Sequence, residues 1–569
     1  MVEQICSRED EGKVWKMKRE AVVSFVLAVL FLVSVFPLST FSGAADSHGS
    51  PGLLGSQSTV DPTDWWPMFH HDLTHNGYST SNAPNTNQTL WNYTTGSDVD
   101  CSPAVAGGIV YVDSDDQNVY ALNATTGTLI WNYTTGGIVF SSPAVAGGIV
   151  YVGSWDGNVY ALNATTGAQV WNYATGNRVW SSPAVAGGVV YVGSDNGKIY
   201  ALNATTGAQV WNYATGSVVY SSPAVAGGVV YVGSGNDKVY ALNATTGAQV
   251  WNYATGNSVI SSPAVAGDVL YVGSMDGKVY ALNATTGAQV WNYTTGNSVL
   301  CSPAVAGDVV YVGSWDNKVY ALNATTGTFI WNYTTGGIVF SSPAVAGGIV
   351  YVGSDDSKIY ALNATTGAQV WNYATGDYVV SSPAVAEGIV YVGSYDGKIY
   401  AFGVHDVAVT NVTPSKTVVG QGFSASINVT VANQGGYTEA FNVTAYANVT
   451  AIQTETLTLT SQSSATLTFT WDTTGFTMGN YTLSAYAEPI PSEANMPNNN
   501  FTLVDILQVT IPGDINGSGI VDFFNAAKLS AAFNATPKSP NWNPNADINS
   551  DGVVDIYDAI ILAGHFNQH

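Results

Sequence analysis

A 40-residue unit of short apolar runs recurs through the middle of the chain. Residues 141–180 read SSPAVAGGIVYVGSWDGNVYALNATTGAQVWNYATGNRVW, in which SPAV, IVYVGS, VYALN and QVWNY are rich in β-branched and aromatic residues. The separators AGG, DG and ATTG are typical of tight turns, so each unit is predicted to form four short strands. A period of about 40 to 45 residues is typical of propellers and solenoids. No run has a helical period, which disfavours a helical solenoid.

The order of the runs at the two ends of the repeat predicts a closed ring. Eight copies occupy residues 88–403, and the first Trp-Asn-Tyr run, at Trp91, precedes the first Ser-Pro-Ala-Val run. The last Ser-Pro-Ala-Val run, at Ser382, has no Trp run after it. If residues 90–95 pair with the unit at 381–402, the ring closes with no free sheet edge. We therefore predict an eight-bladed β-propeller in a mainly β chain.

Strand-length alternation continues over residues 404–510. Runs such as SINVTVANQ and ATLTFTW alternate apolar residues with Thr, Ser and Asn. About seven short strands predict an immunoglobulin-like β-sandwich. No cysteine pair and no catalytic group of residues stands out, so a spacer or adhesion role is the default.

Two loops rich in Asp and Asn, each followed by an apolar helical run, make up residues 511–569. The first loop, 514–525, reads DINGSGIVDFFN, and the second, 547–558, reads DINSDGVVDIYD. Oxygen-bearing side chains at positions 1, 3 and 5, a glycine at position 6 and a main-chain carbonyl at position 7 suit Ca²⁺. We predict a small helical domain that folds around one or two calcium ions. The candidate ligands are Asp514, Asn516, Ser518, Ile520, Asp522 and Asn525 in the first loop, and Asp547, Asn549, Asp551, Val553, Asp555 and Asp558 in the second.

The N-terminus has the order of a secretory signal. Residues 21–36 are an apolar run of sixteen residues behind two basic residues, with Pro37 and small residues after it. This order predicts a signal peptide over residues 1–45 and a lead-in segment over 46–87. An uncleaved anchor helix is the alternative, although a ~30 Å hydrocarbon core needs a longer run. We expect an extracellular or cell-surface protein with no membrane span after signal removal.

Charge excludes one class of partner. The chain carries 15 Lys and Arg against 39 Asp and Glu, a net charge of −24. A phosphate-neutralising surface needs clustered bases, so nucleic acid is not expected as a partner. Cys101 and Cys301 occupy the same position in two repeats. A disulfide framework is therefore not expected.

The repeat resembles a known family. The stretch ALNATTGAQVW, at residues 161–171, is similar to the tryptophan-docking motif A-x-D-x-x-T-G-x-x-x-W of PQQ-type propellers, with Asn in place of Asp. The segment DWWPMFHHDLTHNGYS, at residues 64–79, resembles the lead-in before such repeats. The resemblance implies that each Trp stacks on the neighbouring blade, which is a structural role.

The same resemblance includes quinoprotein dehydrogenases, which use a cation, an Asp base, a charged partner for the quinone and often a vicinal disulfide. This chain has no adjacent cysteines, and Arg178 is the one arginine of its repeats. The Asp residues at 113, 115, 195 and 355 are interpreted as turn residues. We do not expect PQQ or catalysis, and a quinoprotein oxidoreductase or a glycan-active propeller enzyme stays as the alternative.

Variation between the copies predicts a ligand face. The copies differ mainly in the turn after YVGS and in the link between blades, which emerge on the same side of a four-stranded blade. Exposed Trp, Tyr and Arg are typical of binding hot spots, so we predict a recognition surface for a glycan or a protein. Drift at tolerant turns after duplication is the alternative, with some of these aromatics simply packing between blades. The candidate residues are Trp155, Arg178, Trp315, Tyr378 and Tyr395.

Seven repeats carry the sequon Asn-Ala-Thr in the turn between their third and fourth strands. In an exported protein these Asn residues are candidate glycosylation sites. The competing interpretation is an Asx-type turn, in which the Asn side chain bonds to its own main chain. The candidates are Asn123, Asn163, Asn203, Asn243, Asn283, Asn323 and Asn363.

The two C-terminal segments also resemble known domains. With VTVANQGG and MPNNNFT, residues 404–510 resemble the CARDB-type modules of surface proteins. The duplicated loops resemble type I dockerins, in which positions 5 and 12 favour acids, so Ser518 and Asn525 make the first loop the weaker site. Dockerins bind cohesin domains, so the resemblance implies a cohesin-like protein partner. The residues expected at that contact are Phe523, Phe524, Ile556 and Tyr557.

Overall fold

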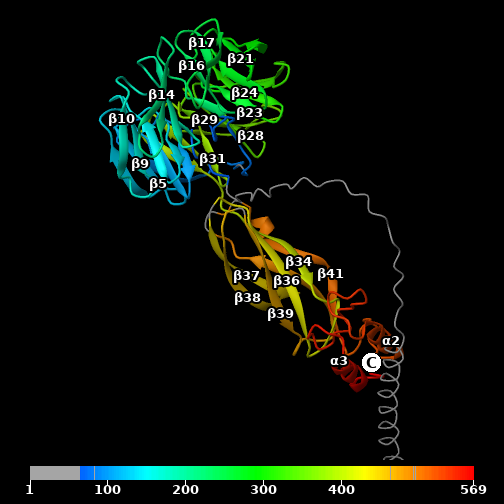
Figure 1. Cartoon of the computed structure of the whole chain (residues 1–569). Coiled ribbons are helices and arrows are strands. Elements are labelled where there is room, and N and C mark those ends of the chain that lie inside the picture. The colour runs from blue at the N-terminus through cyan, green and yellow to red at the C-terminus, as the bar shows by residue number, and fades with distance from the viewer. Residues whose placement is uncertain are drawn as a thin grey trace, which may run out of the picture. The chain divides into compact units, whose positions relative to one another are not determined.

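The computed structural model describes residues 64–568, except Ala83, Tyr437, Gln462, Pro491, Ser492 and Ala494. The chain divides into two compact units, one ending at Val404 and one running from His405 onward (Figure 1). The predicted signal peptide, residues 1–45, and the first part of the lead-in lie outside the described residues.

The N-terminal unit contains eight sheets, each built on four antiparallel strands of one repeat, and a further strand joins one of them in parallel. The first strands are β3 (Ala104–Ala106), β7 (Ala144–Ala146), β11 (Ala184–Ala186), β15 (Ala224–Ala226), β19 (Ala264–Ala266), β23 (Ala304–Ala306), β27 (Ala344–Ala346) and β31 (Ala384–Ala386). The second strands are β4 (Ile109–Asp113), β8 (Ile149–Gly153), β12 (Val189–Ser194), β16 (Val229–Ser234), β20 (Val269–Gly273), β24 (Val309–Ser314), β28 (Ile349–Ser354) and β32 (Ile389–Ser394). The third strands are β5 (Asn118–Asn123), β9 (Asn158–Asn163), β13 (Lys198–Asn203), β17 (Lys238–Asn243), β21 (Lys278–Asn283), β25 (Lys318–Asn323), β29 (Lys358–Asn363) and β33 (Lys398–Phe402). The fourth strands are β6 (Leu129–Thr134), β10 (Gln169–Ala174), β14 (Gln209–Ala214), β18 (Gln249–Ala254), β22 (Gln289–Thr294), β26 (Phe329–Thr334), β30 (Gln369–Ala374) and, in the last sheet, β2 (Thr89–Thr94).

The last sheet takes its fourth strand from the start of the repeat region. Strand β2 pairs antiparallel with β33, with Trp91 opposite Ala401 and Tyr93 opposite Ile399. The indole Nε1 of Trp91 donates to the carbonyl oxygen of Ala124 in the next blade, at 2.9 Å. Six further repeats make the same contact with the alanine carbonyl of the neighbouring blade, as the family motif implies. Trp371 instead donates to the carbonyl oxygen of Pro84 in the lead-in, at 3.1 Å.

A ring of buried serines also links the blades. The main-chain N–H of Ser102 donates to the hydroxyl of Ser142 at 2.9 Å, and the bond repeats from blade to blade. The N–H of Ser382 completes the ring by donating to Ser102 Oγ at 3.2 Å. These serines precede the first strands, so the eight first strands surround the axis of the ring.

The C-terminal unit begins with a β-sandwich. One sheet contains β34 (Val407–Pro414), β36 (Ser424–Asn433) and β39 (Ser464–Asp472), and the other contains β35 (Val418–Gly420), β41 (Asn500–Thr510), β40 (Gly479–Ala487), β37 (Glu439–Ala447) and β38 (Thr450–Leu459). A short 3₁₀ helix, η1 (Met496–Asn499), precedes β41. The structure has one strand more than the sequence predicts, because the short β35 pairs parallel with β41. Buried Phe469 and Trp471 lie in the core between the sheets.

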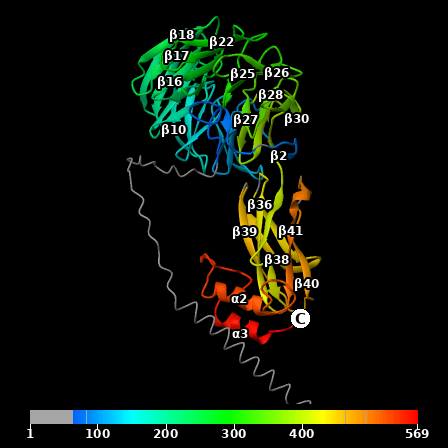
Figure 2. The same cartoon turned by 90° about the vertical axis from the view of Figure 1, so that its right-hand side faces the viewer.

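Two helices follow the sandwich, α2 (Phe523–Ala532) and α3 (Ile556–Gly564) (Figure 2). They pack around buried Leu529 and Leu562. Each begins at an aspartate N-cap, because Asp522 accepts from Phe524 N and Asp555 accepts from Tyr557 N. The structure confirms the predicted fold class: mainly β, with a propeller, a sandwich and a small helical domain. None of the described helices is long and apolar enough to cross a membrane.

Removal of the closing tryptophan should cost as much as removal of one in the middle of the ring. Trp91 and Trp211 are 9% and 8% exposed, and each donates to a neighbouring carbonyl at 2.9 Å. Trp→Ala in a core costs about 3–5 kcal/mol, so W91A and W211A should lower the urea midpoint of the propeller equally. A W91A midpoint close to that of the unmodified protein would show that β2 does not close the ring.

Candidate recognition surface and calcium-binding loops

The two positions that differ most between repeats are joined by a hydrogen bond in every blade. The residue that starts the turn between the second and third strands donates its main-chain N–H to the preceding inter-blade link. Trp155 donates to the carbonyl of Ile138, and Tyr395 donates to that of Tyr378, both at 2.9 Å. The other pairs are Asp115–Asp98, Asp195–Arg178, Gly235–Val218, Met275–Ser258, Trp315–Ser298 and Asp355–Ile338. Turns and links therefore form one surface, which we call the variable face.

Four aromatic rings form a continuous group on the variable face, which we call the aromatic cluster: Phe140, Trp155, Trp180 and Tyr220. The ring of Phe140 stacks on Trp180 and on Trp155, with centroids 4.6 and 4.7 Å apart, and Trp180 contacts Tyr220 edge-on at 5.3 Å. The guanidinium Cζ of Arg178 lies over Trp155, 4.6 Å from the ring centroid. Such contacts contribute about 0.5–1.5 kcal/mol each, so the rings hold one another in place.

The residues predicted for the ligand site are Trp155, Arg178, Trp315, Tyr378 and Tyr395. Tyr378 is 48% exposed. Contrary to the sequence expectation, Trp155, Trp315 and Tyr395 are partly buried. Only Trp155 packs with Arg178, whereas Trp315 packs on Phe340 of the following link and Tyr395 lies near Tyr378. The aromatic turns therefore pack on adjacent links and do not gather into one exposed patch.

Three buried or partly buried carboxyl groups lie on the first blade: Asp100, Asp113 and Asp115. From the sequence, the last two are interpreted as turn residues and Asp100 is not singled out. The pKa of Asp100 is raised to about 8 by burial and by the negative charges of Asp115 and Asp98. A hydrogen bond from Tyr395 lowers this pKa but does not cancel the shift. Burial and the charge of Asp98 raise the pKa of Asp115 to about 6. Asp113 ends β4 instead of lying in the turn, and neither carboxylate oxygen has a hydrogen-bond partner among the described residues. Burial raises the pKa of Asp113 well above its usual range.

The sequence carried a signal for Asp113. It replaces the glycine of the YVGS run, which all seven other repeats keep. A substitution at a position where the other copies are identical marks a local departure from symmetry, and that comparison would have separated Asp113 from the turn residues.

The lead-in segment lies inside the ring, across its axis. It accepts hydrogen bonds from the first strands of six blades, and its strand β1 (Tyr78–Ser79) pairs parallel with β27. The bonds run from Val105 N to Trp66 O, Val145 N to Pro67 O, Val225 N to Leu73 O, Val265 N to Thr74 O, Val305 N to Asn76 O and Val345 N to Gly77 O. We call residues 64–80 the plug.

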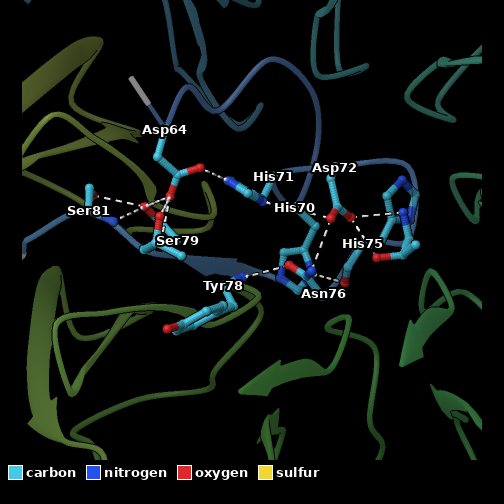
Figure 3. A network of polar contacts seen from close by, with 11 residues as sticks. Asp64, His70, His71, Asp72, His75, Asn76, Tyr78, Ser79 and Ser81 are labelled. Atoms are coloured by element: carbon cyan, nitrogen blue, oxygen red, sulfur yellow. Dashed lines mark hydrogen bonds and ion pairs between the residues drawn. The ribbon is translucent and has the colours of Figure 1, made fainter. Parts of the chain in front are cut away.

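Polar contacts within the plug fix its path (Figure 3). Asp64 accepts from His71 Nε2 at 3.0 Å and from the hydroxyl of Ser79 at 2.7 Å. Burial alone would raise the pKa of Asp64, but these bonds and the charge of His71 bring it far below its usual value. His70 and His75 are buried, and His70 Nδ1 donates to the carbonyl of His75 at 2.9 Å. Sequence reasoning missed these histidines as structural groups.

The second calcium loop holds two buried carboxylates. Asp547 accepts from the N–H of Asp551 at 3.1 Å and of Gly552 at 3.0 Å. Asp558 Oδ1 accepts from Ile548 N, and its Oδ2 accepts from Asp555 N. Burial raises the pKa of both carboxyl groups, and the negative charge of Asp547 raises the pKa of Asp558 further. A cation between these oxygens would offset the cost of burying the two negative charges, so the donor set fits calcium.

A lysine from the sandwich touches the outside of this loop. Lys416 Nζ donates to the carbonyl oxygen of Asp547 at 2.5 Å and to Ser550 Oγ at 2.8 Å. Burial lowers the pKa of Lys416, and the charges of Asp547 and Asp558 oppose this shift. Sequence reasoning missed Lys416, because no local pattern connects it with a loop so far along the chain.

The first loop differs at position 12. Asn525 Oδ1 accepts from Ile515 N at 2.7 Å and Asn516 N at 3.2 Å, as Asp558 Oδ1 does in the second loop. The amide Nδ2 of Asn525 donates to Ile520 O at 2.8 Å and Asp522 Oδ1 at 3.2 Å. Asp522 and its counterpart Asp555, both predicted as ligands, cap helices with their carboxylates. Among the described residues, no group of three or more His, Cys, Asp or Glu side chains is placed to hold a metal ion, so any ion needs the Asn, hydroxyl and carbonyl oxygens as well.

The sequon asparagines all make the Asx-type turn. In each repeat the Asn Oδ1 accepts from the main-chain N–H of the Thr three residues later, at 2.8–2.9 Å. The residues are Asn123, Asn163, Asn203, Asn243, Asn283, Asn323 and Asn363. This bond accounts for the asparagine, and glycosylation stays a prediction.

Family models cover all three domains. Residues 77–217 and 334–410 match the model described as outer membrane protein assembly factor BamB, of the PQQ-like repeat class, and residues 149–348 match the β-propeller of the β-alanine-activating enzyme. Residues 405–503 match CARDB, and residues 512–567 match the type I dockerin domain. The chain combines a PQQ-like propeller, a CARDB domain and a type I dockerin domain. Dockerin and CARDB domains are typical of extracellular proteins, and type I dockerins bind calcium and a cohesin partner.

Solved structures share the propeller fold. BamB from Moraxella catarrhalis is 23% identical, with a TM-score of 0.50, over 55% of this chain and 98% of that one. A europium-containing methanol dehydrogenase is 17% identical, with a TM-score of 0.53, over 59% and 91%. A quinohemoprotein alcohol dehydrogenase from Comamonas testosteroni is 18% identical, with a TM-score of 0.54, over 60% and 80%. At these identities the likeness shows the fold alone. No curated protein matches the chain.

Acid should weaken the plug. Burial lowers the pKa of His70 from 6.5 to about 4 and that of His75 from 6.5 to about 3. Below pH 6.5 the two histidines therefore bind protons in the unfolded chain but stay neutral in the native plug. The free energy of unfolding then falls toward pH 4, by about 1.4 kcal/mol for each unit of pKa shift. The measurement is the urea midpoint at pH 7 and pH 5.

The double variant H70N/H75N is the control for this titration. It keeps the carboxyl groups with raised pKa, such as Asp100, whose effect on stability has the opposite sign. The difference between the two proteins therefore isolates the histidines, and the variant should lose less stability on acidification. Equal losses in both proteins would contradict the buried neutral histidines.

Proposed function

We propose that this chain is an exported docking protein. Its dockerin domain attaches it to a cohesin-type partner, and its propeller presents the variable face to an extracellular glycan. The observation that carries the proposal is a pair of exposed apolar positions at the start of each dockerin helix. Phe523 and Phe524 on α2 are 56% and 69% exposed, and Ile556 and Tyr557 on α3 are 36% and 63% exposed.

These pairs occupy positions 10 and 11 of the two loop motifs, so the duplication repeats an apolar contact as well as an ion loop. Large exposed apolar side chains on a small domain are costly in water and are typical of interface hot spots. The N-caps Asp522 and Asp555 fix the first turns that carry them. The helices therefore present two preformed contact points to a protein partner.

Replacement of these side chains should remove docking. The double variant F524S/Y557S should bind a panel of purified cohesin domains at least tenfold more weakly than the unmodified chain, because each hot-spot side chain is worth about 2 kcal/mol or more. Surface plasmon resonance in calcium buffer measures the affinity. V504S is the matched control, since Val504 is 96% exposed on β41 of the sandwich. Unchanged affinity of F524S/Y557S for a cohesin that binds the chain would rule out this contact.

The aromatic cluster supports the second half of the proposal. Its rings are partly buried and stacked, and Arg178 adds a positive charge beside Trp155. Flat aromatic surfaces with nearby polar groups suit the apolar faces and hydroxyls of sugars. The other face is built from turns that barely change between repeats, so ligand selection is expected on the variable face.

The glycan part is tested on an array of polysaccharides. The double variant W155S/W180S should lose binding that the unmodified propeller shows, while F329S should keep it, because Phe329 is 49% exposed on the outer strand β26. Circular dichroism confirms the fold of each variant. Array binding unaffected by W155S/W180S would contradict a glycan site at the cluster, and capture of a protein instead of a glycan would contradict the ligand class.

The acids of the first blade favour a second candidate function, a quinoprotein oxidoreductase. Buried carboxyl groups with raised pKa values are frequent in catalytic sites, and Asp100 and Asp113 stand where no other repeat has an acid. Against it, Cys101 and Cys301 are buried free thiols in different blades, so they form no vicinal disulfide. Added PQQ with Ca²⁺ should leave no quinone absorbance on the desalted protein, and retained absorbance that D113N abolishes would establish the second function.

A further inference from the structure

We infer that only the second loop of the dockerin domain binds calcium, and that the amide of Asn525 closes the first loop in place of an ion. The inference deepens the proposed docking function, on which it rests. It gives the domain one metal-dependent half and one metal-independent half.

Main-chain donors fix the orientation of the side chain at position 12 in both loops. Asn525 Oδ1 accepts from Ile515 N and Asn516 N, at 2.7 and 3.2 Å. Asp558 Oδ1 accepts from Ile548 N and Asn549 N, at 2.6 and 3.1 Å. The second atom of the side chain is therefore an oxygen in the second loop and an NH₂ group in the first.

An amide NH₂ group is not a calcium ligand, because its nitrogen lone pair is delocalised into the carbonyl and its hydrogens point outward as donors. Rotation of the Asn525 amide by half a turn would set the NH₂ against two main-chain N–H groups and lose both of their bonds. The same NH₂ donates at 2.8 Å to Ile520 O, the carbonyl at position 7 that an ion would need. The partial positive charge of the amide therefore lies beside an oxygen that calcium would otherwise neutralise.

The carboxylate at position 1 of the first loop is already satisfied. Asp514 Oδ2 accepts from Gly519 N at 2.7 Å and from Thr510 Oγ1 at 2.8 Å, and Oδ1 accepts from Ser518 N at 3.1 Å. Its counterpart Asp547 has donors from Asp551 N and Gly552 N alone among the described side-chain contacts. The hydroxyl of Thr510 has no counterpart at the second loop.

The difference in negative charge between the two loops also favours calcium in the second loop. The first loop contains two aspartates and the second contains four, and one aspartate of each loop caps a helix. Lys416 beside Asp547 offsets one of these charges, and the second loop is still the more negative. A divalent cation gains less from the first loop, because Ser518 stands where the second loop has Asp551 and Asn525 stands where it has Asp558. Donor type, orientation and charge therefore agree.

Calcium stoichiometry tests the inference on the full secreted chain. After EGTA treatment and desalting, isothermal titration with CaCl₂ should show one tight ion per chain. D558N should lose that ion, and D514N should keep it. Weak binding by acids elsewhere in the chain persists in D558N and is subtracted. Two tight ions, or loss of an ion in D514N, would overturn the inference.

A gain of binding gives an independent measure. The variant S518D/N525D should bind a second ion, and in EGTA its melting temperature should fall below that of the unmodified chain, because the new carboxylate faces Ile520 O without a cation. N534D is the matched control, since exposed Asn534 lies outside both loops and its replacement adds a negative charge. A folded S518D/N525D that still binds one ion would show that Asn525 is not what closes the loop.

Cohesin binding is scored separately on the same samples. A chain with one ion that binds no cohesin contradicts the docking function and leaves the ion count standing. A chain with two ions that binds cohesin contradicts the ion count alone.

Discussion

The propeller depends on one antiparallel pairing, between β2 and β33. All other blade contacts are local repeats of the same unit, so each blade can form its own strands from neighbouring sequence. The pairing of Trp91 with Ala401 supplies the fourth strand of the last sheet and places the Trp91 indole on Ala124 of the first blade. At the same junction Ser382 N donates to Ser102 Oγ and completes the serine ring. Without it the ring would have two open edges, and an exposed edge strand pairs readily with other chains.

Near-identity of the repeats limits where function can lie. The serine contact recurs in all eight blades, and the indole–alanine contact and the Asx turn each recur in seven. A contact repeated around the ring distinguishes no position. The departures from symmetry are the aromatic cluster, the acids at Asp100 and Asp113, and the plug. The first two lie among the turns and links of the variable face or at the strand end beside it, and the plug crosses the axis. The dockerin domain shows the same principle, because two copies of one loop differ at position 12.

Much of this architecture could be predicted from the sequence, because a fixed period and turn-forming separators specify strands and their order. Ring closure followed from the displaced Trp91 run alone. The metal-loop residues were also found, because their spacing is local. Contacts between distant segments could not be predicted from the sequence. They are the hydrogen bonds of the plug to six blades, the bond from Lys416 to the second loop, and the stacking of Phe140 on Trp180. From the sequence, Trp155 is expected to be exposed because it lies in a turn. A position in a turn does not reveal that the side chain packs on a link between blades.

The plug and β2 leave the ribosome before the blades, yet their partners include some of the last strands of the propeller to be made. Strand β2 ends at Thr94, whereas β33 begins at Lys398, so β2 waits for almost the entire propeller. Every other third strand already has a fourth strand joined to it by a short turn, and β33 alone lacks one. That vacancy selects the correct edge among eight similar ones, but it does not distinguish the chain's own β2 from that of a neighbour. Formation of a closed monomer therefore depends on dilution during synthesis, since two crowded chains can exchange β2 and satisfy the same hydrogen bonds as an intertwined dimer.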